Sequence, residues 1–158
     1  MAERNNAVAA PGQPTIVITR IVDAPRELVW QAWTEPKHVA QWWGPNGFTN
    51  TIHAMDVKPG GVWRFVMHGP DGTDYPTKVV YREVVKPERL VYDLSGEDER
   101  DAHSFRATVT FVERSGKTEV TMASLFPSVA ARDAVLKFGA VEGGAQTLAR
   151  LAEYLPGM

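Results

Sequence analysis

Apolar and polar residues follow two rhythms along this chain, one typical of strands and the other typical of helices. Residues 15–22, TIVITRIV, are β-branched at nearly every position, which predicts a strand. Asp23 and Pro25 then mark the start of a helix. A second short helix begins near Pro36, and the Gly-Pro pair at 44–45 ends it. The first third of the chain is therefore predicted to hold one strand and two short helices.

Six further strands are predicted from apolar residues at every second position. They cover residues 51–57, 62–68, 78–85, 90–94, 103–113 and 118–126. Glycine, proline and acidic residues fill the short connections between them. Because the connections are short, consecutive strands are expected to pair as an antiparallel meander.

After Ser128 the apolar residues recur every three or four positions, which predicts one long helix near the end of the chain. The stripe consists of Phe138, Val141, Ala145, Leu148, Ala152 and Leu155. Gly139, Gly143 and Gly144 weaken this helix, by roughly 1 kcal/mol each relative to alanine.

Together these elements predict an α+β fold in which one sheet wraps one helix. A seven-stranded antiparallel sheet with an apolar face must be covered, and only the C-terminal helix is long enough to do so. Antiparallel sheets twist strongly, so we expect the sheet to curl around that helix. Curling leaves a gap where the helix carries small residues, here Gly144 and Ala145.

Composition narrows the classes of function. A chain of 158 residues is most simply one domain, here 14–158, after a mobile tail over 1–13. It has no cysteine, which excludes disulfides and thiolate metal sites. The net charge of -2 argues against nucleic acid and acidic membranes as partners, and no apolar run could span a membrane. We therefore expect a cytoplasmic protein.

Four segments carry a resemblance to a known family. They are residues 23–45, DAPRELVWQAWTEPKHVAQWWGP, residues 59–72, PGGVWRFVMHGPDG, residues 87–92, PERLVY, and residues 139–155, GAVEGGAQTLARLAEYL. Over about residues 15–155 the chain resembles bacterial proteins related to the activator of the heat-shock-protein-90 ATPase. These belong to the START-like superfamily, also called SRPBCC.

The resemblance implies the helix-grip (START/Bet v-like) fold and an apolar cavity between sheet and helix. It implies no particular reaction, because members variously bind lipids or hormones, close polyketide rings, sequester antibiotics or act as co-chaperones. Function therefore has to be argued from the site itself.

The strand 62–68 supplies the first candidate wall of that cavity. Trp63, Phe65 and Met67 share one side of it, and aromatic rings beside an adaptable methionine suit a ligand pocket. Plain core packing is the competing interpretation, since any half-buried strand alternates in this way. Trp43 is a candidate for gating the cavity mouth or plugging the end of the sheet. The expected ligand-binding residues are Trp43, Trp63, Phe65, Met67, Tyr75, Tyr92, His103, Phe105, Met122, Phe138 and Val141.

Polar residues supply no recognisable catalytic set. The four histidines form neither an HxH nor an HExxH pattern, so we expect no metal, and nothing indicates a cofactor. His103 shares strand parity with Phe105, which makes it the histidine best placed to face a ligand. Arg64, Glu83 and Asp93 are expected to face water or to pair across the sheet. No nucleophile elbow, catalytic triad or phosphate-binding loop is visible.

The leading hypothesis is a binding module without catalysis for a small, largely apolar molecule such as a lipid. A guest that buries about 300 Å² of apolar surface would gain roughly 7 kcal/mol before the entropy cost of association. A wholly apolar pocket would favour this hypothesis.

Two alternatives stay open. One is a cyclase-like or hydrolase-like enzyme that uses His103, Glu83 or Tyr75 for proton transfer in the same cavity, and a buried, paired acid or histidine would favour it. The other is a co-chaperone or other protein-interaction module with a part in the stress response. A flat exposed apolar patch would favour that role, with a homodimer as one form of it.

Overall fold

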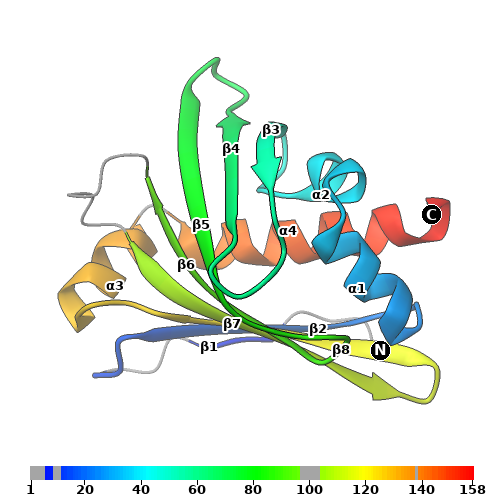
Figure 1. Ribbon diagram of the computed structural model, residues 1–158. Coiled ribbons are helices and arrows are strands. Elements are labelled where there is room, and N and C mark those ends of the chain that lie inside the picture. The colour runs from blue at the N-terminus through cyan, green and yellow to red at the C-terminus, as the bar shows by residue number, and fades with distance from the viewer. Residues whose placement is uncertain (1–5, 9–11, 97–103, 138) are drawn as a thin grey trace.

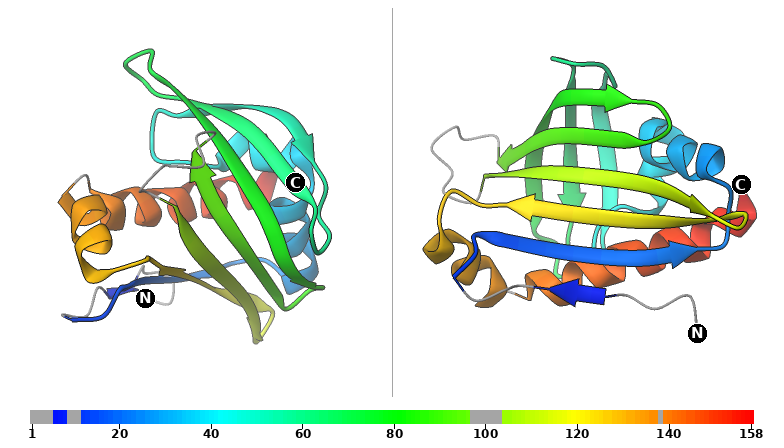
Figure 2. Two further views of the ribbon diagram at one scale, coloured as in Figure 1. Left: turned by 60° about the vertical axis from the view of Figure 1, so that its left-hand side comes forward. Right: turned by 90° about the horizontal axis from the view of Figure 1, so that it is seen from below.

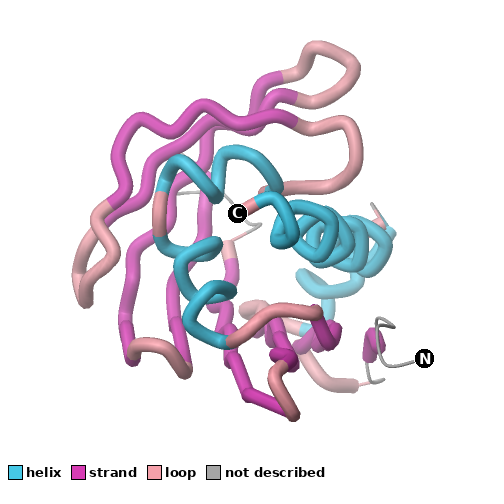
Figure 3. Tube along the Cα trace, turned by 90° about the vertical axis from the view of Figure 1, so that its right-hand side faces the viewer, coloured by secondary structure: helices cyan, strands magenta, loops and turns pink. Residues whose placement is uncertain are grey.

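The computed structural model describes residues 6–8, 12–96, 104–137 and 139–158. In these ranges the strands form one eight-stranded antiparallel sheet in the order β1-β2-β8-β7-β6-β5-β4-β3. The sheet is strongly curved, and α4 runs along its concave side (Figure 1). Seen from the end, the strands form an open curve around the helices (Figure 3). The predicted helix-grip architecture is confirmed.

The bounds of the elements agree closely with the sequence pattern. The strands are β1 (Asn6–Val8), β2 (Thr15–Val22), β3 (Thr49–Met55), β4 (Val62–His68), β5 (Asp74–Val85), β6 (Arg89–Gly96), β7 (Phe105–Arg114) and β8 (Lys117–Leu125). The helices are α1 (Arg26–Thr34), α2 (Pro36–Trp42), α3 (Val129–Lys137) and α4 (Ala140–Tyr154), followed by a 3-10 turn, η1 (Leu155–Gly157).

The short strand β1 lies within the segment that was expected to be a tail. Its residues 6–8 pair antiparallel with residues 17–19 of β2, so the described sheet has eight strands where the sequence predicted seven. The edge of β2 is thereby covered over these residues. Three residues are too few to show an alternation of apolar and polar positions, so the sequence pattern did not predict β1.

The predicted long C-terminal helix is present as α4, but a break at Gly139 divides the helical segment after Ser128 into α3 and α4. Gly139 adopts a left-handed conformation, with φ 80°, between α3 and α4. Its amide donates to the Leu136 carbonyl, which ends α3, and its own carbonyl accepts from the Gly143 amide in the first turn of α4. Glycine takes this conformation without the steric cost of a side chain.

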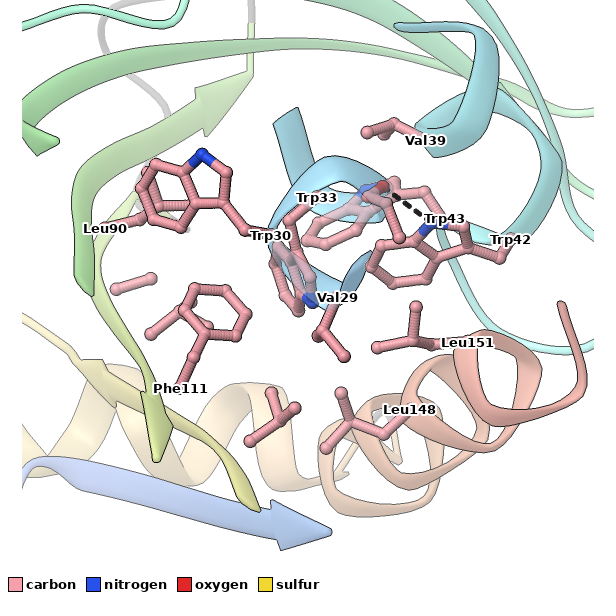
Figure 4. Packing of buried hydrophobic residues seen from close by; sticks show 14 of the residues in the cluster. Val29, Trp30, Trp33, Val39, Trp42, Trp43, Leu90, Phe111, Leu148 and Leu151 are labelled. Atoms are coloured by element: carbon pink, nitrogen blue, oxygen red, sulfur yellow. Dashed lines mark hydrogen bonds between the residues drawn. The ribbon is translucent and has the colours of Figure 1, made fainter. Parts of the chain in front are cut away.

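An aromatic cluster closes one end of the curved sheet. Trp33 makes edge-to-face contacts with Trp42 and Trp43, at ring-centroid distances of 4.9 and 5.4 Å. The Trp42 indole donates to the Ala32 carbonyl at 3.0 Å, and Leu148 and Leu151 of α4 complete the cluster (Figure 4). Helix α3 lies at the opposite end of the molecule from α1 and α2 (Figure 2). The interior is therefore filled at the α1 end.

Candidate functional site

A cavity of about 340 Å³ lies between the concave face of the sheet and the two C-terminal helices. Its wall comes from β2, β4, β6, β7 and β8, from the loop at residues 43–45, and from α3 and α4. Strand β2 and helix α4 are far apart in the sequence, yet they face each other across this space. The cavity expected from curvature and small helix residues is present.

Small residues of α4 determine where the cavity lies. Ala140, Gly143 and Gly144 contribute to its wall. A Cβ atom at Gly144 would overlap the Cδ1 atom of Ile18 on β2, so helix and sheet approach closely at this point. Of the two residues expected at the gap, Gly144 lines the cavity and Ala145 is not part of the wall.

Five of the expected ligand-binding residues lie on the cavity wall. They are Trp43, Met67, Tyr92, Phe105 and Met122. Four of them, Met67, Tyr92, Phe105 and Met122, lie on strands and point to the concave side of the sheet. His103 and Phe138 lie outside the described residues.

Four expected residues lie elsewhere, and packing explains why. Trp63 and Phe65 stack on each other, with ring centroids 4.2 Å apart, and are buried in the aromatic core at the filled end. Tyr75 is 46% exposed and lies beside Phe48, where β5 extends past the cavity. Val141 is half-buried and packs against the core from the side of α4. On β4, only Met67 reaches the open end of the interior.

The rim of the cavity is held by an arginine that sequence reasoning missed. Arg150 of α4 donates from one Nη atom to the carbonyls of Trp43, Gly44 and Pro45, at 3.2, 3.0 and 3.0 Å. Partial burial of the guanidinium lowers the pKa of Arg150, opposed by the charge of Glu153. An arginine on a helix shows no sequence sign of such partners, because they are backbone atoms of a distant loop.

The polar atoms of the wall are few and neutral. No charged side chain lines the cavity among the described residues, and the hydroxyls come from Tyr92, Ser124 and Thr147. The Thr147 hydroxyl already donates to the Gly143 carbonyl at 2.8 Å. Tyr92 is 3% exposed, and burial raises the pKa of its phenol well above the ordinary value, so the hydroxyl keeps its proton. Ser124 was missed, although it shares parity with Met122.

The comparisons with known proteins assign the family. The family described as Activator of Hsp90 ATPase homolog 1-like protein matches residues 23–156. The chain belongs to this family. Its fold is one that generally binds ligands, and the matched segment includes nearly all of the cavity wall. No curated protein matches the chain.

Solved structures of bacterial proteins share the fold of this family member. Protein Ms6760 from Mycobacterium smegmatis is 26% identical, with 94% of each chain covered and a TM-score of 0.85. A protein from Arthrobacter aurescens is 23% identical over 97% of this chain and 92% of its own, with a TM-score of 0.89. A protein from Staphylococcus epidermidis is 25% identical over 99% and 94%, with a TM-score of 0.81.

The outer face of the sheet carries charged residues that pair with one another. Asp93 accepts from Nε of Arg82 and from Nε of Arg106, both at 2.7 Å. Hydrogen bonding from Arg106, and then from Arg82, holds the pKa of Asp93 below its ordinary value against the effect of burial. Glu83 pairs with Arg89 at 2.9 Å and is exposed. Both acids thus pair across the sheet, as the sequence predicted.

A second hollow, of about 600 Å³, lies over this charged face. Arg64, Lys78, Arg82, Asp93 and Arg106 are on its wall. We regard the smaller cavity as the candidate site of this family member, because its wall is neutral and largely apolar and it lies between sheet and helix.

A triad-like chain of hydrogen bonds, which was not predicted from the sequence, lies on the outer face of the sheet. His68 places Nδ1 at 2.7 Å from Asp74 Oδ1 and Nε2 at 2.8 Å from Thr51 Oγ1. The three residues come from β4, β5 and β3, so no sequence spacing predicts their meeting. None of them lines either hollow, so the chain lacks a described pocket that would hold a substrate against it.

Within the described residues no group of three or more acidic or histidine side chains could hold a metal ion. None of the described helices is both long enough and apolar enough to cross a membrane.

Proposed function

We propose that this protein binds a small, largely apolar molecule in the cavity between the sheet and α4 and releases it chemically unchanged. The observation that carries the proposal is a space of about 340 Å³ between sheet and helices whose described wall is largely apolar, with the hydroxyl groups of Tyr92, Ser124 and Thr147 among its few polar groups. This volume is at the lower end of the range for small-molecule sites, which are mostly apolar with a few placed polar groups.

The enzyme alternative has less support from the described residues. Of its suggested proton carriers, Glu83 is exposed and paired with Arg89, and Tyr75 is 46% exposed. Neither lines the cavity. The triad-like chain of Thr51, His68 and Asp74 is likewise on the outer face. A general acid or base has to lie within hydrogen-bond reach of the reacting group, so these residues could not serve a ligand inside.

A protein-interaction role has its support in the family description. The large apolar residues that are exposed in the described part of the chain are spread over three strands, with Tyr75 and Val85 at opposite ends of β5. A docking surface needs a contiguous patch, so this arrangement favours the internal ligand. Assembly into a homodimer, lipid as the ligand, a part in the stress response and a cytoplasmic location stay predictions.

Filling the cavity tests the proposal. Ala107 is buried on the wall between Tyr92 and Ser124, so Ala107→Leu should occupy part of the space. Ala123 lies on the opposite face of the neighbouring strand, and Ala123→Leu is the matched control. We expect a neutral solvatochromic dye to bind wild type and Ala123→Leu saturably and to lose at least tenfold in affinity for Ala107→Leu.

Denaturant unfolding of each variant checks that the fold is kept, because overpacking costs about 1–3 kcal/mol. Native mass spectrometry of the freshly purified protein should also show a co-purifying small molecule, recovered in the same form after incubation. A dye signal that does not saturate, or equal affinity for both leucine variants, would refute binding in this cavity. Conversion of the recovered molecule by wild type would favour the enzyme.

A further inference from the structure

Two hydroxyl groups and a methyl group form one row across the sheet side of the cavity. Tyr92 on β6 is opposite Ala107 on β7, and Ala107 is opposite Ser124 on β8. All three side chains line the cavity. Neighbouring strands lie about 4.8 Å apart, and alanine in the middle leaves the space above it free for a guest. The row is therefore open to whatever occupies the cavity.

The Tyr92 hydroxyl has no described partner inside the protein. It makes no hydrogen bond with another described residue, and neither does the Ser124 hydroxyl, whereas Thr147 donates to the Gly143 carbonyl. The indole nitrogens of Trp33 and Trp63 are fully buried and have no hydrogen-bond partner. The hydroxyl oxygen of Tyr92 is not among these fully buried atoms without a partner. Because Tyr92 is 3% exposed and lines the cavity, the cavity is the space in which its hydroxyl group could find a partner.

We propose that the cavity selects neutral apolar molecules carrying a hydrogen-bond acceptor, such as a ketone or ester oxygen, which accepts from the Tyr92 hydroxyl beside Ser124. This inference rests on the proposed function and adds the chemical class of the ligand to it.

The electrostatics of the wall explain the selection. A buried phenol that stays protonated is a donor, so a guest without an acceptor leaves that donor unpaired in an apolar site. A carboxylate or ammonium group would lose its hydration without meeting an opposite charge, because no charged side chain lines the cavity among the described residues. A neutral acceptor satisfies the phenol and brings no charge into the cavity.

Three probes of nearly equal shape separate these cases: acetylnaphthalene, ethylnaphthalene and naphthoate, each substituted at the same ring position. We expect wild type to bind the ketone about fivefold more tightly than the hydrocarbon, the ratio that one net hydrogen bond provides. The anion should bind most weakly. Fluorescence titration and calorimetry give the three affinities.

The matched variants are Tyr92→Phe and Tyr81→Phe. Tyr81 is opposite Tyr92 on β5 and is 2% exposed, but it does not line the cavity. Each variant loses one buried hydroxyl and keeps its ring. Tyr92→Phe should equalise the affinities for ketone and hydrocarbon, whereas Tyr81→Phe should keep the wild-type ratio. The infrared carbonyl band of the ketone bound to wild type should also shift to the lower frequency of a hydrogen-bonded carbonyl, which tests the contact without any variant.

The possible failures are distinguishable. If wild type binds ketone and hydrocarbon equally and the carbonyl band does not shift, the hydroxyl anchor is wrong while apolar binding stands. If Tyr92→Phe and Tyr81→Phe lowered the ratio of ketone to hydrocarbon affinity equally, the role of the Tyr92 hydroxyl would also be refuted. The preference for the ketone would then result from general packing. If none of the probes saturates, the proposed function fails and the anchor fails with it.

Discussion

At the scale of single residues, Gly144 sets how closely α4 can approach β2. A Cβ atom there would overlap the end of the Ile18 side chain, which is buried and itself lines the cavity. The nearest free space for a displaced Ile18 is the cavity itself. The size of the cavity thus depends on the absence of one methyl group at Gly144.

Replacing Gly144 by alanine should therefore reduce ligand affinity more than stability. Alanine raises helix propensity by about 1 kcal/mol, which offsets part of the cost of moving Ile18. We expect the unfolding free energy to change by less than about 1 kcal/mol and the affinity for acetylnaphthalene to fall severalfold. Denaturant unfolding and fluorescence titration measure the two quantities.

Gly143→Ala is the control for this prediction. A Cβ atom at Gly143 would meet Pro45 Cγ at 3.4 Å, an ordinary contact, so the variant gains propensity without displacing Ile18. It should be at least as stable as wild type and keep most of its affinity. If the two alanine variants lost affinity equally, close approach at Gly144 would not be what sets the cavity size.

Several residues show where sequence reasoning reaches its limit. Strand alternation correctly placed Met67 on the same inner face as Trp63 and Phe65, because the side-chain period of a strand is fixed. Parity could not separate Met67 from Trp63 and Phe65, since position along the strand decides which residues meet the aromatic cluster and which meet the cavity. That position depends on how α1 and α2 pack, which is a property of the assembled fold.

At the scale of elements, two features could not be predicted from the sequence: the break between α3 and α4 at Gly139, and the hydrogen bonds from Arg150 to the loop at residues 43–45. The sequence marked three glycines as weak points of one helix, but local propensity does not say which of them takes a positive φ. The structure assigns this to Gly139 and keeps Gly143 and Gly144 helical. The apolar stripe was nonetheless correct at Leu148 and Leu155, which are fully buried.

Arg150 joins α4 to the loop that forms the cavity rim, so its loss should loosen that rim. Arg150→Met keeps a long stem for packing and removes the donors to the carbonyls of Trp43, Gly44 and Pro45. We expect a loss of about 2 kcal/mol in unfolding free energy. A bound dye should also dissociate several times faster, as followed by stopped-flow fluorescence.

Arg150→Lys tests whether charge alone suffices. Lysine keeps the charge but lacks the planar fork of guanidinium donors, so it should recover only part of the stability and of the slow dissociation. Unchanged dissociation from the methionine variant would show that the rim is held by other contacts, such as the bond from Asn50 to the Trp43 carbonyl.

At the scale of the whole molecule, the outer charges make stability depend on pH. Asp93 bridges β5, β6 and β7 through Arg82 and Arg106, and its pKa in the folded protein lies below that in the unfolded chain. A carboxyl group with a depressed folded pKa contributes stability above its unfolded pKa, near 3.9. That contribution is lost as the pH falls through the folded value.

Asp93→Asn should therefore destabilise the protein at neutral pH and have little effect in strong acid. We expect a loss of about 1 kcal/mol near neutrality, the upper end for a partly exposed ion pair, and convergence with wild type once the pH lies below the pKa of Asp93 in the folded protein. Urea unfolding over a pH series measures the difference. Glu83→Gln, which removes an exposed pair with a single arginine, should show a smaller difference. If the difference in unfolding free energy between wild type and Asp93→Asn stayed constant into strong acid, packing and not charge would be its cause.

The pairing of β2 with β8 has a consequence for how the protein is made. Strand β2 leaves the ribosome before its long-range partner β8 and before α4, which forms the opposite side of the cavity. A nascent chain that ends before α4 has a sheet face with nothing to cover it and no enclosed space for a guest. The proposed ligand could thus be captured only after α4 has been synthesised, and a ligand that binds the folded state alone would raise the yield of folded protein during synthesis.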